Sequence, residues 1–167
     1  MQDFTIAVLV QNQFGVLNRV TSLFRRRRFN ISSLTVSETE SPKCSRITVK
    51  STGEQAMKNQ LMDQLYKLPE VVSIKEMHDS ESINCELLLI KMKNTPETRE
   101  DIRAAADAFG ARTVDYTRDS MMFQVTDDSR RIDRFIELMR DYTILEICRT
   151  GIIALERGSE TILENDV

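Results

Sequence analysis

Apolar residues recur along the chain with two alternating spacings, and the order of these spacings repeats after roughly 80 residues. In the first half, the strand-like segments are 4–10, 30–36, 45–51 and 71–77, and the segments with helical spacing are 16–24 and 54–68. The second half repeats this order, with strands at 85–93, 111–117, 120–126 and 144–158. The sequence therefore predicts an α+β protein of two tandem βαββαβ domains, each an antiparallel sheet with helices on one face.

Glycines and prolines fall mostly between these segments, where they punctuate the chain. Pro69 ends the second helix, Gly110 is placed as the C′ residue of the third, and Gly151 interrupts the last strand. The segment around His78 is polar and has no periodicity. We predict a first domain at 1–78, a linker at 79–84, a second domain at 85–158 and a flexible tail at 159–167.

The strand at 4–10 is apolar on both faces, although helices would cover only one face of its sheet. We therefore expect oligomerisation, with edge strands or sheet faces meeting across a symmetry axis.

Charge and composition exclude several classes of partner. The net charge is −3 with a pI near 5.3, which gives no general attraction to nucleic acid or to anionic membranes. The arginines at 25–28 are interpreted as a solvated helix end, with a docking surface for an acidic protein as the alternative. The βαββαβ order also occurs in RNA-recognition modules, but the central strands supply only Phe4 and Phe123 for stacking. We expect no nucleic-acid partner.

No apolar run approaches the length of a membrane span, and we expect a soluble, cytoplasmic protein. Cys44, Cys85 and Cys148 are odd in number and widely spaced, which fits a reducing compartment. Catalytic chemistry is not indicated either, since the only histidine is His78 and no acidic pair or Ser/His set has a recognisable spacing. Phosphate-binding and metal-ligand motifs are also absent from the sequence. We predict no catalytic residue, no metal site and no cofactor in this chain.

The segment NQFGVLNRV at 12–20 is the candidate for binding a small ligand. Free N–H groups of Gly15, Val16 and Leu17 at a helix N-terminus can bind a carboxylate, and Gly15 allows close approach. Asn12 and Asn30 offer side-chain carbonyls to an ammonium group. The set suits a zwitterionic aliphatic amino acid, with an apolar wall formed by Val16, Leu17 and Ile31.

Larger motifs extend this interpretation. NQFGVLNRV, FNISSLTV, SRITV and QLYKLPEVVSI together resemble an amino-acid-sensing ACT domain. With ELLLIKM, VDYTRDSMMFQVT and RTGIIALERG, the whole of 4–158 resembles the small regulatory subunits of acetolactate synthase. The resemblance implies tandem ferredoxin-like domains and a non-catalytic subunit that activates a catalytic (large) subunit and confers feedback inhibition by valine in branched-chain amino-acid biosynthesis. It also implies that thiamine diphosphate, FAD and Mg²⁺ belong to that catalytic partner.

The resemblance further implies a homodimer through the ACT domains, with valine or a related branched-chain amino acid at the interface. One chain would supply Asn12, Gly15, Val16, Leu17 and Asn18, and its partner would supply Asn30 and Ile31. Arg28 occupies a position where the family commonly has glycine, which costs about 1 kcal/mol if the backbone there is left-handed. The alternative function is a free-standing ACT-domain sensor that regulates another enzyme or transcription.

Overall fold

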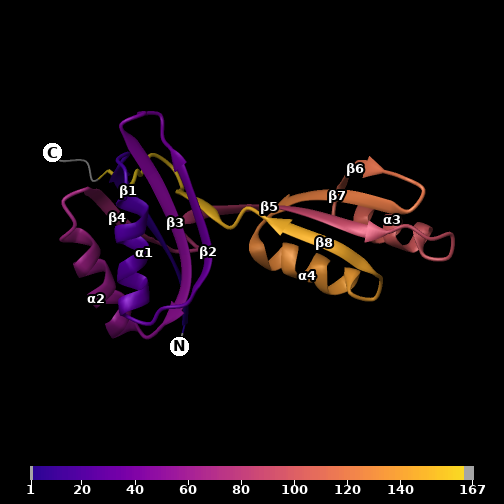
Figure 1. Cartoon of the computed structure of the whole chain (residues 1–167), viewed down its shortest axis with the longest axis horizontal. Helices are drawn as coiled ribbons and strands as arrows, with labels where there is room; N and C mark the ends of the chain where they lie inside the picture. Colours follow the sequence, from indigo (N-terminus) through magenta and orange to yellow (C-terminus); the bar gives the residue numbers. More distant parts are fainter. Residues whose placement is uncertain (1, 164–167) are drawn as a thin grey trace. The chain divides into compact units, whose positions relative to one another are not determined.

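The structure is a computed structural model that describes residues 2–163 and contains two compact units (Figure 1). The first unit comprises the chain up to Ile83 together with the segment from Ile152 onward. The second unit is Asn84–Gly151, so it is inserted into the sequence of the first.

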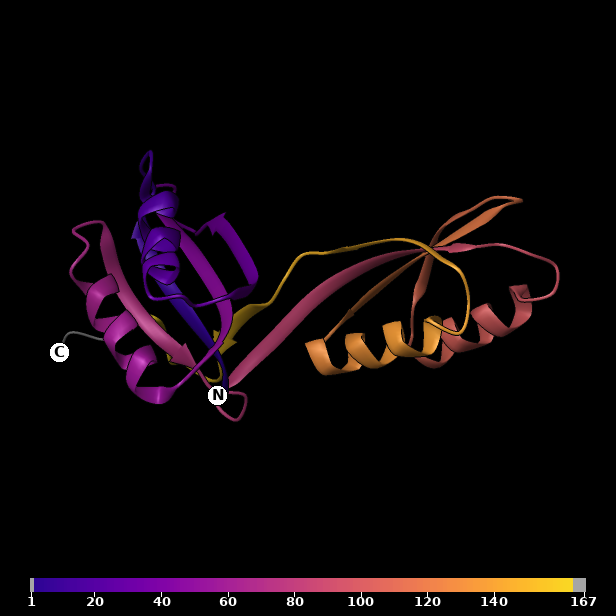
Figure 2. The ribbon, with the colours of Figure 1, turned by 60° about the horizontal axis from the view of Figure 1, so that its bottom comes forward.

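The first unit has the predicted βαββαβ order, which confirms the fold class. Its antiparallel sheet has the strand order β2-β3-β1-β4. Figure 2 shows its two helices lying together on one side of the sheet. The elements are β1 (Gln2–Gln11), α1 (Val16–Arg26), β2 (Ile31–Glu38), β3 (Cys44–Gly53), α2 (Gln55–Tyr66) and β4 (Val71–Met77).

The second unit repeats this order, and its main sheet path is β6-β7-β5-β8. Its helices α3 and α4 also share one face of the sheet (Figure 2). The elements are β5 (Ser82–Lys93), α3 (Arg99–Ala108), β6 (Arg112–Tyr116), β7 (Ser120–Asp127), α4 (Ser129–Met139) and β8 (Ile144–Arg149).

Each unit has its own apolar core between helices and sheet, as the two periodicities require. In the first unit, Phe29 contacts Phe4 and Phe24 edge to face, with ring centroids 5.6 and 6.3 Å apart. In the second, Phe123 of β7 and Phe135 of the apolar stripe of α4 are almost fully buried. The stripes identified from the sequence are therefore the surfaces that face the sheets.

The chain after Gly151 belongs to the first unit, and its strand pairs with β5. Gly151 has φ 83°, and the strand that follows it is β9 (Ile153–Glu156). Ala7 and Leu9 point away from the helices because neighbouring residues of a strand face opposite sides. They are covered by an apolar cluster that contains Met77, Ile152, Ala154 and Ile162.

Several hydrogen bonds hold this returning segment on the first unit, among them two from side chains of the sheet. Arg46 Nη2 donates to the Ala154 carbonyl at 2.8 Å, and Ser73 Oγ donates to the Ile162 carbonyl at 2.6 Å. The chain itself therefore covers part of the sheet face for which the sequence suggested a second copy of the chain. The second unit ends at Gly151, whereas the second domain was predicted to extend to residue 158. The segment predicted as a flexible tail, 159–167, includes the buried Ile162. Residues 164–167 of that tail lie outside the described residues.

The segment predicted as a linker at 79–84 is a tight turn followed by the start of β5. The Glu81 and Ser82 N–H groups both donate to the His78 carbonyl at 2.9 Å. Ser82 is 3% exposed and is the first residue of β5. The polar composition of this segment reflects the turn that connects β4 to β5.

An ion pair between a buried carboxylate and a partly exposed guanidinium joins β5 to β8 in the second unit. The Glu86 side chain is 3% exposed and accepts hydrogen bonds from Arg149 Nε, from Arg149 Nη2 at 2.9 Å and from Ser129 Oγ at 2.7 Å. Arg149 Nη1 also donates to Asp133 Oδ1 at 2.7 Å. The hydrogen bond to Glu86 raises the pKa of Arg149 above its already high usual value, so the guanidinium remains charged.

Helices α1 and α3 end in the same backbone motif, but the residue with positive φ differs between them. Beyond α1, Arg28 N donates to Arg25 O and Phe29 N donates to Phe24 O, both at 3.0 Å. This is the Schellman pattern, and it holds Arg28 in the left-handed region at φ 58°. Beyond α3, the corresponding residue is Gly110 at φ 67°. Arg28 therefore has the left-handed backbone for which the sequence predicted a cost of about 1 kcal/mol.

We expect Arg28→Gly to stabilise the chain by about 0.5–1 kcal/mol, because glycine adopts this conformation without the Cβ penalty. Urea unfolding followed by circular dichroism measures the gain. Gly110→Arg is the matched control and should lose a similar amount, since a Cβ at Gly110 meets nothing within 4 Å and only the backbone is strained. A fall in stability for Arg28→Gly would contradict the assignment of strain to this residue.

Candidate effector-binding site

The loop between β1 and α1 presents an open helix N-terminus. β1 ends where Gln11 N donates to the Glu70 carbonyl at 2.8 Å and Asn12 N donates to the Lys43 carbonyl at 2.7 Å. The chain then turns through Gly15, which precedes α1 in a left-handed conformation at φ 84° and ψ −6°. A Cβ built on Gly15 meets nothing within 4 Å, so this mouth of the helix faces open space.

Several backbone donors at this mouth have no acceptor in the chain. Within residues 2–163, the N–H groups of Gly15, Leu17 and Asn18 donate to no other group. Val16 N, which was expected among the free donors, donates to the Gln13 carbonyl at 3.4 Å. The first turn of α1 also contains no acidic residue and no side-chain cap. Free N–H groups and the positive end of the helix dipole together form a site suited to a carboxylate.

The predicted site residues of this loop differ in where their side chains lie. Val16 is 4% exposed and packs in the core, so its side chain lies away from the mouth. Leu17 is 37% exposed, and Asn18 is exposed beside it. Asn12 Nδ2 donates to Glu38 Oε1 at 2.9 Å and to the Pro42 carbonyl at 3.1 Å. These bonds fix the amide and leave its Oδ1 as the atom that can accept from a ligand.

Asn30 and Ile31 lie at the other end of the sheet from this loop. Ile31 pairs with Ser51, whereas Glu38, which holds Asn12, pairs with Ser45. The β2 strand between Ile31 and Glu38 spans about 23 Å at the usual rise per residue. One copy of the chain therefore does not bring the two groups of predicted site residues together.

Two features near the loop were not singled out in the sequence. Phe14 is fully exposed at the tip of the loop, where its place between Gln13 and Gly15, off any apolar stripe, was the available signal. Arg19 forms an ion pair with Glu70, whose side chain is 11% exposed. Glu70 Oε2 is buried and has no hydrogen-bond partner within the described chain. No local pattern connects Arg19 with Glu70, because the two are far apart in sequence.

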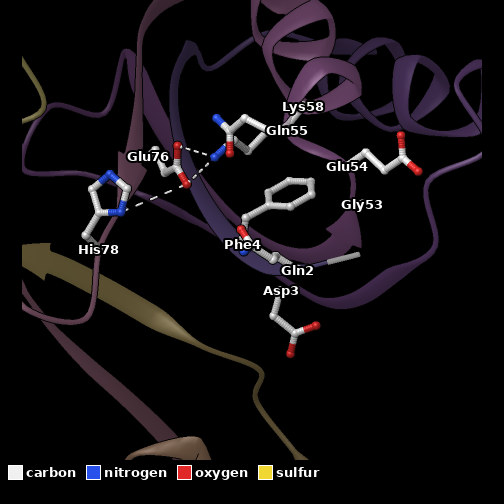
Figure 3. A pocket seen from close by; sticks show the side chains of 9 residues that line it. All are labelled: Gln2, Asp3, Phe4, Gly53, Glu54, Gln55, Lys58, Glu76 and His78. Carbon is white, nitrogen blue, oxygen red and sulfur yellow. Dashed lines mark hydrogen bonds and ion pairs between the residues drawn. The ribbon is translucent and has the colours of Figure 1, made fainter.

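A separate pocket of about 410 Å³ lies at the opposite end of β1 (Figure 3). Lys58 Nζ donates to both carboxylate oxygens of Glu76, at 2.5 and 2.6 Å, and lies 5.9 Å from the centroid of the Phe4 ring. His78 Nδ1 is 4.0 Å from Glu76 Oε1, and its side chain is more than half exposed. Lys58 and Glu76 neutralise each other, so neither side chain is left as an isolated charge for an amino acid.

We also searched residues 2–163 for a metal site, a membrane-spanning helix and a disulfide. They contain no group of three or more His, Cys, Asp or Glu side chains that could hold a metal ion. Over the same range, no helix is both long and apolar enough to cross a membrane. Cys44, Cys85 and Cys148 are free thiols.

Comparisons with known proteins identify the same protein family in both halves of the chain. Residues 85–158 match the family model "Small subunit of acetolactate synthase", and residues 6–73 match the model "AHAS small subunit-like ACT domain". The chain is 46% identical over 156 residues to the "Probable acetolactate synthase small subunit" of Archaeoglobus fulgidus, covering 93% of this chain and 98% of that protein. It is 42% identical to the acetolactate synthase small subunit of Bacillus subtilis, covering 93% and 91% of the two chains.

Among solved structures, the chain is similar to the crystal structure of the acetolactate synthase small subunit from Thermotoga maritima. The two share 32% sequence identity with a TM-score of 0.87, and the match covers 96% of this chain and 100% of that one. Two family models, the relatives and this structure thus cover both units.

Proposed function

Because the chain belongs to the family of acetolactate synthase small subunits, we propose that it activates a catalytic large subunit and makes that activity sensitive to valine. Members of this family are regulatory subunits and are not catalytic themselves. We expect thiamine diphosphate, FAD and Mg²⁺ to be held by the catalytic subunit. We also place the complex in the cytoplasm, which the three free thiols favour.

The observation that carries the effector proposal is the open helix mouth at Gly15. Three N–H groups there have no acceptor within the described part of the chain, and Leu17 provides an exposed apolar side chain beside them. An α-carboxylate accepts from such donors, and a short branched side chain needs only a small apolar contact. The ammonium group of the amino acid then needs acceptors, for which the side-chain carbonyls of Asn12 and Asn30 are proposed.

A second copy of the chain would bring the two halves of this site together. β2 is an edge strand of its sheet, and its Leu34 and Val36 are exposed at 37% and 44%. If two β2 strands pair antiparallel across a twofold axis, the start of one lies beside the end of the other. Asn30 and Ile31 of one protomer would then approach Glu38 and the Asn12 loop of its partner, which supports a homodimer with valine at the interface.

Valine held between two protomers would act on the catalytic subunit through linkage. The amino acid binds more tightly to one arrangement of the dimer, so it shifts the population toward that arrangement. A coupling free energy between two sites is typically about 1–3 kcal/mol, which corresponds to a change in affinity of about 5- to 150-fold.

The test is reconstitution with a purified catalytic subunit. Acetolactate formation should rise when this chain is added and should fall again when valine is added to the mixture. Parallel titrations with leucine and isoleucine against the isolated chain would establish the effector preference. If the chain stimulated the catalytic subunit at no ratio of the two proteins, the proposed function would be refuted.

A further inference from the structure

The end of α1 concentrates positive charge in a chain that is acidic overall. Arg25, Arg26, Arg27 and Arg28 are consecutive, and the sequence between Asp3 and Glu38 has no aspartate or glutamate. Arg25, Arg26 and Arg28 are exposed, and none of the four forms an ion pair within residues 2–163. Among the described residues, only Arg27 of the four has a side-chain hydrogen-bond partner, donating to Gln60 Oε1 at 3.1 Å. The cluster is therefore an unneutralised basic surface on a protein of net charge −3.

The helix dipole accounts for only part of this cluster. Arg25 and Arg26 lie in the last turn of α1, where a cation gains about 0.3–1 kcal/mol from the negative helix end. Arg28 lies beyond the helix at φ 58°, in a position that α3 fills with Gly110. Its side chain makes no hydrogen bond or ion pair within the described chain that would offset the conformational cost. Strained residues of this kind often occur where the side chain serves a function outside the fold.

We propose that Arg25, Arg26 and Arg28 form the surface that docks an acidic patch of the catalytic subunit, an inference that rests on the proposed function. Arginine suits this role because its guanidinium binds carboxylates in a bidentate manner and remains charged at every working pH. Complementary charges also speed association and select the partner. A nucleic-acid partner is disfavoured by the net charge of −3 and by the lack of exposed aromatic side chains on the central strands β1 and β3.

The position of the cluster couples docking to the effector. Arg28 and Phe29 form the Schellman turn, and Asn30 and Ile31, proposed to contact valine, follow immediately. Phe29 is 8% exposed and is held in the core against Phe4 and Phe24. A shift of this turn on effector binding therefore moves the docking arginines, because rigid packing connects them through one residue.

The experiment measures the concentration of small subunit that half-saturates activation of the catalytic subunit. For Arg25→Glu/Arg26→Glu this concentration should rise by about tenfold or more, because like charges then face each other across the contact. The difference in half-saturating concentration between this variant and the wild type should become smaller as the salt concentration rises from about 0.05 M to about 0.5 M. Lys67→Glu/Arg157→Glu is the matched control, since it makes the same charge change at exposed residues of the same unit.

Arg28→Gly separates docking from a structural role. It should raise the free energy of unfolding and yet raise the half-saturating concentration by about 2- to 5-fold, because one charge is lost from the contact. If Arg28 had only a structural role, Arg28→Gly would raise the free energy of unfolding and would not raise the half-saturating concentration. The milder pair Arg25→Gln/Arg26→Gln covers the case in which the double reversal unfolds the chain, and an intermediate loss is expected.

Three outcomes would overturn the inference. They are an unchanged half-saturating concentration in the arginine variants, an equal rise of that concentration in Lys67→Glu/Arg157→Glu, and, in a parallel RNA-binding assay, binding by the wild-type chain that the arginine variants lose while they activate normally. If the wild-type chain gave no activation, the proposed function itself would fail, which distinguishes the two failures.

Discussion

Gly15→Asp is expected to weaken valine binding by about 100-fold or more while the chain still folds and still activates the catalytic subunit. An aspartate at an N-cap accepts from the N–H groups of the second and third helical residues, here Leu17 and Asn18. These are donors proposed to hold the carboxylate of valine, so the variant would fill its own site with a like charge. Calorimetric titration of valine measures the loss.

The fold should tolerate this change. A Cβ on Gly15 meets nothing within 4 Å, and the left-handed backbone costs an aspartate about 1 kcal/mol. Gly15→Asn is the matched control, since asparagine has nearly the same shape and the same backbone strain but no charge. We expect it to bind valine more tightly than the aspartate variant. Wild-type affinity in Gly15→Asp would show that valine binds elsewhere.

Arg149→Met is expected to destabilise the second unit by about 3–5 kcal/mol, because it leaves the Glu86 carboxylate buried without its cation. Methionine replaces most of the aliphatic stem, so lost packing contributes little. Ser129 Oγ remains as a donor to Glu86, but a neutral hydrogen bond does not replace a guanidinium. Urea unfolding followed by circular dichroism measures the change.

The pH dependence of this loss identifies its cause. In the variant, burial without a cation raises the pKa of Glu86 above its unfolded value. The penalty is then absent below the unfolded pKa and grows as pH rises through the folded pKa, so the gap to wild type should narrow between pH 7 and pH 4. Glu86→Met/Arg149→Met removes both charges and should recover more than half of the loss. Equal stability of the single and double variants would rule out this explanation.

The local elements were predictable from the sequence because their patterns are local. The stripe of Val16, Val20 and Phe24 has the helical period, and the structure has α1 from Val16 to Arg26. The final strand shows the limit of this approach. The residues after Gly151 alternate like a strand, but nothing in the alternation indicates that Ile152 and Ala154 pack on Ala7 and Leu9 of the first unit. Such pairing depends on contacts between residues that are remote in sequence.

The candidate site was predictable to a similar degree. Gly15 marked the helix start correctly, since a left-handed residue there favours glycine. The sequence placed Val16 both in the buried apolar stripe of the helix and in the apolar wall of the ligand site. The side chain cannot be in both places, and its exposure of 4% shows that it belongs to the buried stripe. The amide of Asn12 is occupied by Glu38 and Pro42, partners that only the folded β2–β3 connection brings near. The placement of valine itself remains a prediction.

The return of the last segment to the first sheet sets an order of events during synthesis. The ribosome adds about 80 residues between Ile83 and Ile162, which takes roughly 4–16 s at usual elongation rates. Throughout that interval Ala7 and Leu9 of the nascent chain have no cover from Ile152, Ala154 or Ile162. The sheet that is translated first is thus among the last parts of the molecule to be completed.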